Sequence, residues 1–195
     1  MPQPLRPDLV TGVDGLRRCG WGTATPDYAQ YHDQEWGRPV HDDDALFERL
    51  TLEAFQSGLS WLTILRKRQA FRTAFAGFAI GAVAAFGPDD VARLLADPGI
   101  VRNRAKIDAA VANARAAAQL PDGLGALLWS YAPTGRTPRP GRLADVPAAT
   151  PESTALARDL KRRGFRFVGP TTGYALMQAT GMVDDHLDGC HVEPA

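Results

Sequence analysis

Two pairs of residues able to bind a metal stand near opposite ends of this 195-residue chain. Cys19 and His32 form the first pair, and His186 and Cys190 form the second, at an i, i+4 spacing that puts both on one face of a helical turn. Two cysteines and two histidines are the ligand set of a closed structural zinc site. If all four bind one ion, the two ends of the chain must meet, which closes a very long loop. The alternative is two buried free thiols and unrelated histidines.

The chain between these pairs has the pattern of helices. Helix-start signals, which are acidic residues, a capping side chain or proline, precede apolar residues at helical spacing. These starts lie at 42–44, Ser60, Pro88, Asn103, Pro151 and Pro170. No stretch alternates apolar and polar residues in the manner of a half-buried strand. We therefore predict an all-α fold.

Length and composition indicate one globular domain. The 22 basic residues balance 22 acidic residues, so the total charge does not indicate a nucleic-acid partner.

Apolar stretches such as 78–86 are far shorter than the ~20 residues of a membrane span, and the N-terminus lacks the pattern of a signal peptide. We expect a cytoplasmic protein with no membrane partner and with reduced thiols. Residues 1–18 are expected to be a flexible arm, and 19–195 a single domain.

The segment 160–170 joins the last two predicted helices. Gly164 can end the first helix in the left-handed conformation, and Gly169 leaves the N-terminus of the second open to an anion. Five cations lie within nine residues, opposed by one acid, Asp159; they are Arg158, Lys161, Arg162, Arg163 and Arg166. This pattern fits a helix-hairpin-helix that binds the DNA backbone. The alternative is a solvated charged surface.

Aromatic residues are concentrated near one carboxylate. Four of them fall in a 16-residue segment with little helical amphipathicity, which indicates the lining of a cavity, and a fifth follows later; they are Trp21, Tyr28, Tyr31, Trp36 and Trp61. Glu53 has apolar neighbours in sequence, an unusual setting for an acid. A buried carboxylate among aromatic rings would balance a cationic ligand. Alternatively, Glu53 is a satisfied core acid or lies on a helix surface.

Taken together, these features resemble the 3-methyladenine DNA glycosylase I family, within the helix-hairpin-helix glycosylases. The matching motifs are RCGW (18–21), YHDQEWG (31–37), GLSW (58–61), GIVRNRAKI (99–107), RGFRFVG (163–169) and DDH with GC (184–190). They extend from Cys19 to Cys190, in the order of the family. The resemblance therefore covers nearly the whole chain.

The resemblance implies a structural zinc at Cys19, His32, His186 and Cys190, although His191 stands where another cysteine can occur. It also implies that Glu53 contacts the excised base, with Tyr31 and Trp61 in the pocket and Trp21, Tyr28 and Trp36 lining it. A helix-hairpin-helix near 155–180 would bind DNA through Gly164, Arg166, Gly169 and Arg163. The implied function is excision of 3-methyladenine from alkylated double-stranded DNA after base flipping, by a monomer, leaving an abasic site.

Three hypotheses complete this interpretation. Leu59, in a turn, inserts into the gap left by a flipped base. Asp185 supports the zinc ligand His186. The enzyme is monofunctional, because 170–174 lacks a lysine for a Schiff base. Competing functions are a non-catalytic, zinc-stabilised DNA- or lesion-binding protein, and a zinc hydrolase in which water replaces one of the four ligands.

Overall fold

The structure is a computed structural model that describes residues 7–135 and 138–194. Most of these residues are in helices. The elements are β1 (Leu9–Thr11), β2 (Arg17–Cys19), η1 (Gly20–Thr23), α1 (Pro26–Gln34), α2 (Asp43–Gln56), α3 (Trp61–Ala74), η2 (Ala76–Phe78), α4 (Ile80–Ala84), α5 (Pro88–Ala96), α6 (Arg104–Ala117), α7 (Gly123–Trp129), η3 (Leu143–Asp145), α8 (Pro151–Arg162) and α9 (Pro170–Ala179). The prediction of a helical fold is confirmed.

Side chains cap α2 and α3 at their predicted starts. Asp42 accepts a hydrogen bond from the Ala45 amide at 2.9 Å, and Ser60 accepts one from Thr63 at 3.2 Å. These bonds satisfy amide groups that a helix leaves unpaired at its N-terminus. The short helices α4 and α7 have no such side-chain cap and were not predicted.

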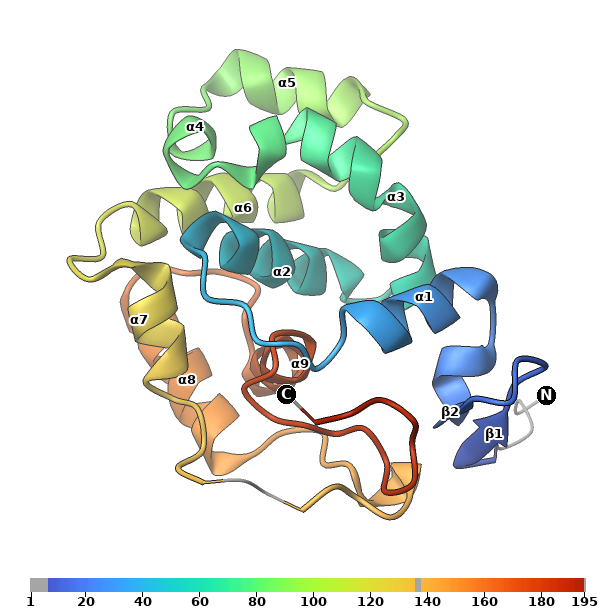
Figure 1. The fold of residues 1–195 in the computed structure, drawn as a ribbon. Helices are drawn as coiled ribbons and strands as arrows, with labels where there is room; N and C mark the ends of the chain where they lie inside the picture. Colours follow the sequence, from blue (N-terminus) through green and yellow to red (C-terminus); the bar gives the residue numbers. More distant parts are fainter. Residues whose placement is uncertain (1–6, 136–137, 195) are drawn as a thin grey trace.

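Helix α2 forms the centre of the molecule. It is buried along most of its length, including Leu46, Phe47, Leu50 and Phe55, none of which is exposed. In Figure 1, helices α3 to α6 lie on one side of α2, and helices α7 to α9 lie on the other. A helix that is apolar on nearly every face requires such neighbours.

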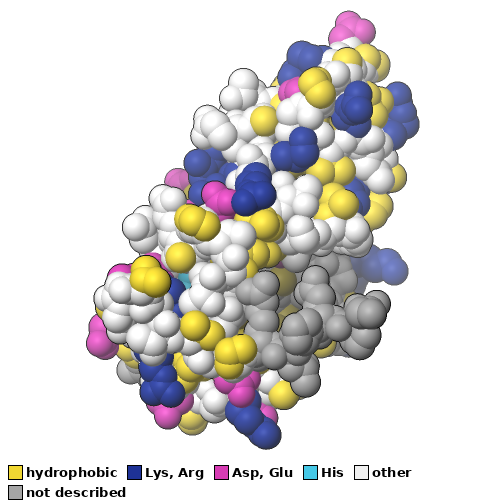
Figure 2. Space-filling model, turned by 90° about the vertical axis from the view of Figure 1, so that its right-hand side faces the viewer, with side chains coloured by type: hydrophobic (Ala, Val, Ile, Leu, Met, Phe, Trp, Pro, Cys, Tyr) yellow, Lys and Arg dark blue, Asp and Glu magenta, His cyan; other side chains and the backbone are white. Residues whose placement is uncertain are grey.

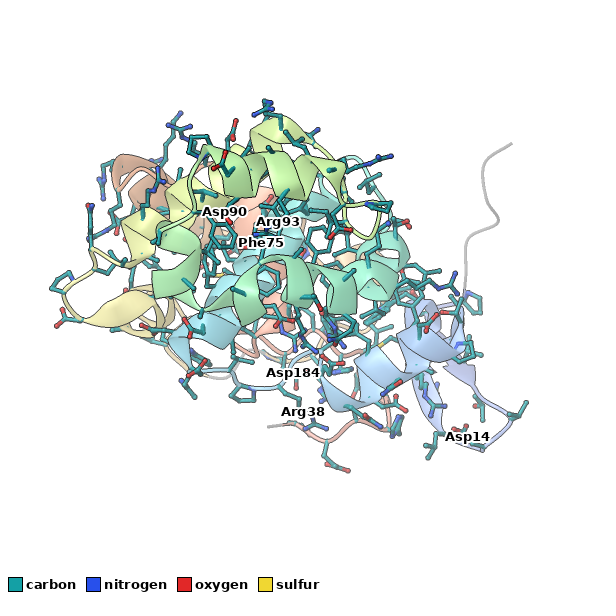
Figure 3. All side chains as sticks on the ribbon, turned by 90° about the horizontal axis from the view of Figure 1, so that it is seen from above. Asp14, Arg38, Phe75, Asp90, Arg93 and Asp184 are labelled. Atoms are coloured by element: carbon teal, nitrogen blue, oxygen red, sulfur yellow. The ribbon has the colours of Figure 1, made fainter. Side chains whose placement is uncertain are left out.

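A group of phenylalanines holds the first of these sides together. Phe75 stacks on Phe78 with ring centroids 5.5 Å apart, and it lies in the interior below α5 (Figure 3). On α5, Arg93 donates to the Ala74 carbonyl at 3.0 Å and pairs with Asp90. The end of α3 is thereby fixed against α5.

The N-terminal segment differs from the prediction of a flexible arm. Residues 1–6 lie outside the described part, but β1 and β2 form an antiparallel hairpin with Leu9 opposite Cys19. Distant groups hold the hairpin, because the amide of Leu143 donates to Asp8 and that of His191 donates to the Arg17 carbonyl. Strands of three residues are too short for an alternating pattern, and the groups that hold the hairpin, at Leu143 and His191, are distant in sequence.

The surface carries charges of both signs. On the face in Figure 2, lysine and arginine side chains are interspersed with acidic and apolar ones. Within 7–135 and 138–194, no helix has both the length and the apolar character needed to cross a membrane.

Candidate active site and metal centre

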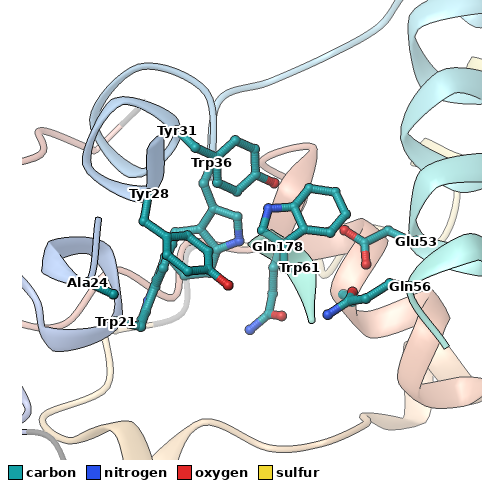
Figure 4. A pocket seen from close by; sticks show the side chains of 10 residues that line it. Trp21, Ala24, Tyr28, Tyr31, Trp36, Glu53, Gln56, Trp61 and Gln178 are labelled. Atoms are coloured by element: carbon teal, nitrogen blue, oxygen red, sulfur yellow. The ribbon is translucent and has the colours of Figure 1, made fainter. Parts of the chain in front are cut away.

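An aromatic pocket of about 400 Å³ opens between α1, the start of α3 and α9 (Figure 4). This volume lies in the range of small-molecule sites. All five predicted aromatic residues and Glu53 line it; the complete lining is Trp21, Ala24, Tyr28, Tyr31, Trp36, Glu53, Gln56, Trp61, Ala175 and Gln178. Four different helices and η1 thus contribute to one cavity.

The aromatic rings support one another. Trp21 makes edge-to-face contacts with Trp36 and Tyr28, at centroid distances of 4.9 and 5.9 Å. Tyr31 and Trp61 lie 5.4 Å apart. The Tyr28 hydroxyl also accepts a hydrogen bond from the Leu62 amide at 3.1 Å, which joins α1 to α3. These contacts fix the ring orientations and leave aromatic faces for a planar ligand.

Glu53 provides the carboxylate of the pocket. Its side chain is directed from α2 toward the aromatic rings (Figure 4), and the residue is only 7% exposed. No described residue donates a hydrogen bond to this carboxylate. Burial raises the pKa of Glu53 from its ordinary value of 4.5 to about 8, and Arg49 opposes this shift. Burial therefore favours the protonated form of Glu53, and a positive charge in the pocket would favour the ionised form.

A charged cluster lies behind Tyr31. Arg49 and Arg68 both donate to the Glu35 carboxylate, the first at 2.9 Å. Despite its burial, these two cations lower the pKa of Glu35. The guanidinium of Arg49 also lies 5.9 Å from the centre of the Tyr31 ring. Burial, followed by the negative charge of Glu53, raises the pKa of Tyr31, so its hydroxyl remains protonated.

Gln56 and Gln178 line the pocket but were not predicted. Gln56 lies one helical turn after Glu53, so the i, i+3 rule could have identified it. Gln178 lies on α9 and donates to Asp185 at 2.7 Å. Only the packing of α9 against α2 brings Gln178 to this cavity.

The four predicted metal-ligating residues meet in a buried cluster. Their ligand atoms all lie within 4.8 Å of one another. Cys190 Sγ lies 3.6 Å from His32 Nε2 and 3.7 Å from His186 Nδ1, and Cys19 Sγ lies 4.0 Å from the same His186 atom. The S–N edge of a tetrahedral zinc site is about 3.6 Å. The donor set and its dimensions therefore fit a metal ion.

The electrostatics of the two thiols favour the same interpretation. The hydrogen bond with Cys190 and burial raise the pKa of Cys19. Two adjacent buried thiolates are unfavourable unless a cation lies between them. A metal ion would supply that cation.

Neighbouring groups hold the histidine rings. Asp33 lies 2.8 Å from His32 Nδ1, and the Trp36 carbonyl lies 3.1 Å from His186 Nε2, so the other ring nitrogens face the cluster. His191 is not one of the four; its Nε2 lies 3.0 Å from Asp33, with which it forms a second group around His32.

The hypothesis that Asp185 supports His186 is wrong. The Asp185 carboxylate accepts hydrogen bonds from the Tyr174 hydroxyl at 2.6 Å and from Gln178 at 2.7 Å. Asp184 instead accepts from the His186 amide. Adjacent positions in an extended segment face different neighbours, which sequence spacing did not show.

Residues 163–169 form a hairpin between α8 and α9. The Gly164 and Phe165 amides donate to the Lys161 and Leu160 carbonyls, which ends α8 in a Schellman motif, and Gly164 has a φ of +92° as predicted. Gly169 is the N-cap of α9, and a Cβ built on it would meet no atom within 4 Å. The free protein therefore does not require glycine there.

The cations of the hairpin region fall into two groups. Arg162 and Arg163 pair with Asp159 at 3.0 and 3.2 Å. Arg158, Lys161 and Arg166 have no acidic or hydrogen-bonding partner for their side chains in the part of the chain that the structure describes. These three line a shallow groove along the hairpin. Arg163, a predicted DNA contact, is thus half-exposed but already paired.

Leu59 is one of few large apolar side chains left exposed, at 41%. It lies between α2 and α3, in a turn where Gly58 has a φ of +81°. Gln56, at the end of α2, also lines the pocket, so this turn adjoins the cavity.

Comparison with known proteins gives concordant matches. A family model described as methyladenine glycosylase matches residues 21–193. The chain is 43% identical to DNA-3-methyladenine glycosylase 1 of Escherichia coli (strain K12) over 92% of its length and 98% of that protein. A crystal structure of a 3-methyladenine DNA glycosylase I superposes with a TM-score of 0.87 at 43% identity, covering 91% of this chain and all of that one. A structure of the 3-methyladenine DNA glycosylase I from Staphylococcus aureus, described as the structural basis of 3-methyladenine recognition, superposes with a TM-score of 0.86 at 37% identity. It covers 91% of this chain and 97% of that one.

Proposed function

The chain belongs to the methyladenine glycosylase family, and from this premise we propose that its aromatic pocket receives the alkylated base, with Glu53 as the catalytic carboxylate. The protein is a DNA glycosylase that excises 3-methyladenine in base excision repair. It acts as a hydrolase of N-glycosyl bonds. The observation that carries the proposed site is one buried carboxylate in a cavity otherwise lined by tryptophan, tyrosine, glutamine and alanine.

The chemistry of the substrate suits this pocket. Methylation at N3 gives the adenine of DNA a positive charge and weakens its glycosidic bond, so a strong general acid is not required. Aromatic faces attract a cation, and a cation in the pocket lowers the pKa of Glu53 and ionises it. The ionised carboxylate would then stabilise the positive charge that develops on the sugar as the bond breaks. The amide of Gln56 and the Oε1 of Gln178, whose Nε2 already donates to Asp185, are available to hydrogen-bond the edge of the base.

We further propose that the fold is a helix-hairpin-helix glycosylase fold that binds double-stranded DNA. The N-terminus of α9 has unpaired amides behind Gly169, and Arg158, Lys161 and Arg166 stand beside it. Both features suit phosphate oxygens. Leu59 would fill the space left by the flipped nucleotide, which offsets part of the unstacking cost of a few kcal/mol. Gly164 allows the turn of the hairpin through its positive φ. Arg163 could contact DNA only after its salt bridge with Asp159 breaks.

The metal is proposed to be a structural zinc. Cys19, His32, His186 and Cys190 would hold it, and four protein ligands leave no position for a reactive water. The ion would join β2 and α1 to the C-terminal segment. Two thiolate ligands fit the reducing cytoplasm, where we place the protein. A zinc hydrolase needs an open ligand position, which this quartet does not offer.

The reaction is proposed to be monofunctional. A lyase needs an amine in the pocket to form a Schiff base. The chain has three lysines, all described, and none lines the cavity. Lys67 and Lys106 donate to backbone carbonyls, and Lys161 lies along the hairpin. Every side chain of the pocket belongs to one chain, so a monomer suffices.

The decisive experiment measures release of 3-methyladenine from alkylated duplex DNA by chromatography. We expect Glu53→Gln to lower the single-turnover rate by about 100-fold, the scale of losing one electrostatic group at a reacting centre. The matched control is Glu48→Gln, which neutralises another buried carboxylate of α2, one paired with Arg72 away from the pocket. The control should retain activity at a temperature where it is folded. Equal rates for Glu53→Gln and the wild type would remove Glu53 from the mechanism.

A further inference from the structure

Helix α6 contains two buried polar residues that the proposed function does not use. Lys106 is 8% exposed and Asn113 is 1% exposed, in a helix whose other buried positions are mostly apolar. Residues of these types are seldom buried without specific partners. The partners of both are backbone groups distant in sequence, at the C-terminal end of α2 for Lys106 and in the 163–169 hairpin for Asn113.

Lys106 holds the loop that carries Leu59. Its ammonium donates hydrogen bonds to the carbonyls of Phe55, at 2.8 Å, and Ser57. These carbonyls stand at the C-terminal end of α2, where a helix leaves acceptors unpaired and favours a cation. The turn at 58–60 starts directly after them, so Lys106 fixes the point from which Leu59 projects.

Asn113 holds the hairpin between α8 and α9. Its Oδ1 accepts from the Arg166 amide at 2.7 Å, and its Nδ2 donates to the Arg166 carbonyl at 3.1 Å. Both backbone groups of the residue in the middle of the hairpin are thus bound by one side chain. The guanidinium of Arg166 has no partner of its own among the described residues.

Lys106 and Asn113, the two anchor residues, are related by the geometry of α6. Positions 106 and 113 differ by seven residues, which is about two turns, so they lie on one side of the helix about 10 Å apart. Apolar residues on the same helix, such as Ile107 and Ala114, are fully buried in the core. Helix α6 also packs against α4, α5 and α2, so it is a rigid support.

We propose that Lys106 and Asn113 are positioning residues, which hold the Leu59 turn and the 163–169 hairpin at a fixed separation so that both engage one stretch of duplex DNA. This inference rests on the DNA contacts proposed above for Leu59 and the hairpin. Neither anchor touches the base pocket. Their loss should therefore weaken DNA binding far more than binding of the free base, although the carbonyls that Lys106 binds flank the pocket residue Gln56.

The test compares Lys106→Met and Asn113→Ala with the wild type. DNA affinity is measured on a duplex with a tetrahydrofuran abasic-site analogue, and base affinity on free 3-methyladenine by tryptophan fluorescence. We expect each variant to bind DNA about tenfold more weakly and to bind the base within about twofold of the wild type. Lys106→Gln, which retains hydrogen-bond donors but not the charge, is the milder variant if Lys106→Met does not fold.

Two further measurements separate positioning from other roles. The slope of log Kd against log salt should be unchanged in Lys106→Met, because a lost phosphate contact would reduce it by about 0.9. In a Leu59→Ala background, Lys106→Met should cost far less than in the wild type, because it acts through Leu59. A merely structural defect would instead add to the effect of Leu59→Ala.

Several outcomes would overturn the proposal. These are DNA affinity within twofold of the wild type, a salt slope reduced by one phosphate, or base and DNA affinities lost in parallel. Two further variants, Leu59→Ala and Arg166→Ala, show whether the positioning proposal or the proposed DNA-binding face is at fault. If they weaken DNA binding and the anchor variants do not, the positioning proposal alone fails. If they have no effect, the proposed DNA-binding face is wrong and the positioning proposal fails with it.

Discussion

At the scale of single residues, burial determines the behaviour of Glu53. The aromatic pocket removes water from the carboxylate and supplies no hydrogen-bond donor from the described residues, so the neutral acid is favoured. Arg49, one turn earlier on α2, opposes this effect but is itself paired with Glu35. The pocket thus contains a group whose ionisation depends on whether a cation is bound.

This environment makes the stability of the protein depend on pH. The pKa of Glu53 is about 8 in the folded state against an ordinary value of 4.5, so the folded protein retains a proton that the unfolded chain has lost. Between these values, stability falls as pH rises, by at most about 1.4 kcal/mol per pH unit. We expect the Tm of Glu53→Gln minus that of the wild type to increase from pH 4.5 to 8 and then level off. Parallel curves, measured calorimetrically, would contradict this.

At the scale of elements, the two glycines of the hairpin have different functions. Gly164 has a φ of +92°, which an L-residue adopts at a cost, whereas Gly169 has a φ of −90° and open space around its Cα. The first glycine is required by the turn itself. The second leaves room for a group from outside the protein.

The two alanine variants should therefore affect different properties of the protein. Gly164→Ala should lower the stability of the protein by about 1 kcal/mol. Gly169→Ala should change stability by less than about 0.5 kcal/mol and weaken duplex DNA binding about tenfold, because its methyl group would block a phosphate. Denaturant titration and fluorescence anisotropy measure the two quantities. Normal DNA affinity in Gly169→Ala would exclude the N-terminus of α9 as a contact.

At the scale of the whole molecule, the Cys/His cluster joins the two ends of the chain. Around it pack Leu187 and Val192, a small buried group separate from the main core. The four Cys/His residues and this group together hold β2, α1 and the C-terminal segment in place. The pocket depends on them, because Trp21 and Trp36 contact the rings of His32 and His186.

Loss of the proposed zinc should loosen this side of the molecule. We expect the wild type to contain one zinc per chain by mass spectrometry, and Cys190→Ser to contain none and to melt about 10 °C lower. Faster hydrogen exchange should be confined to 9–34 and 184–192. The matched control is His191→Ala, which removes the contact with Asp33 but retains all four ligands. An unchanged Tm in Cys190→Ser would show that the cluster does not stabilise the fold.

The sequence by itself determined the longer helices, whose starts carry capping side chains or prolines, and the chemical types of the site; the short helices α4 and α7 were not predicted. Caps such as Ser60, prolines at helix starts and the Schellman glycine Gly164 act locally, so their effects can be read from neighbouring residues. The motifs that resemble the glycosylase family identified the Cys/His quartet and the aromatic residues around Glu53. In this sense the content of the site was predictable.

Only the tertiary structure decided which groups meet. The β1–β2 hairpin exists because Leu143 and His191 hold it, and Gln178 reaches the pocket because α9 packs on α2. Asp185 binds Tyr174 rather than His186, and Asn113 binds a loop 53 positions away. Hydrogen bonds between distant segments depend on how whole helices pack together, and the identity of these partners leaves no periodic signal in the sequence.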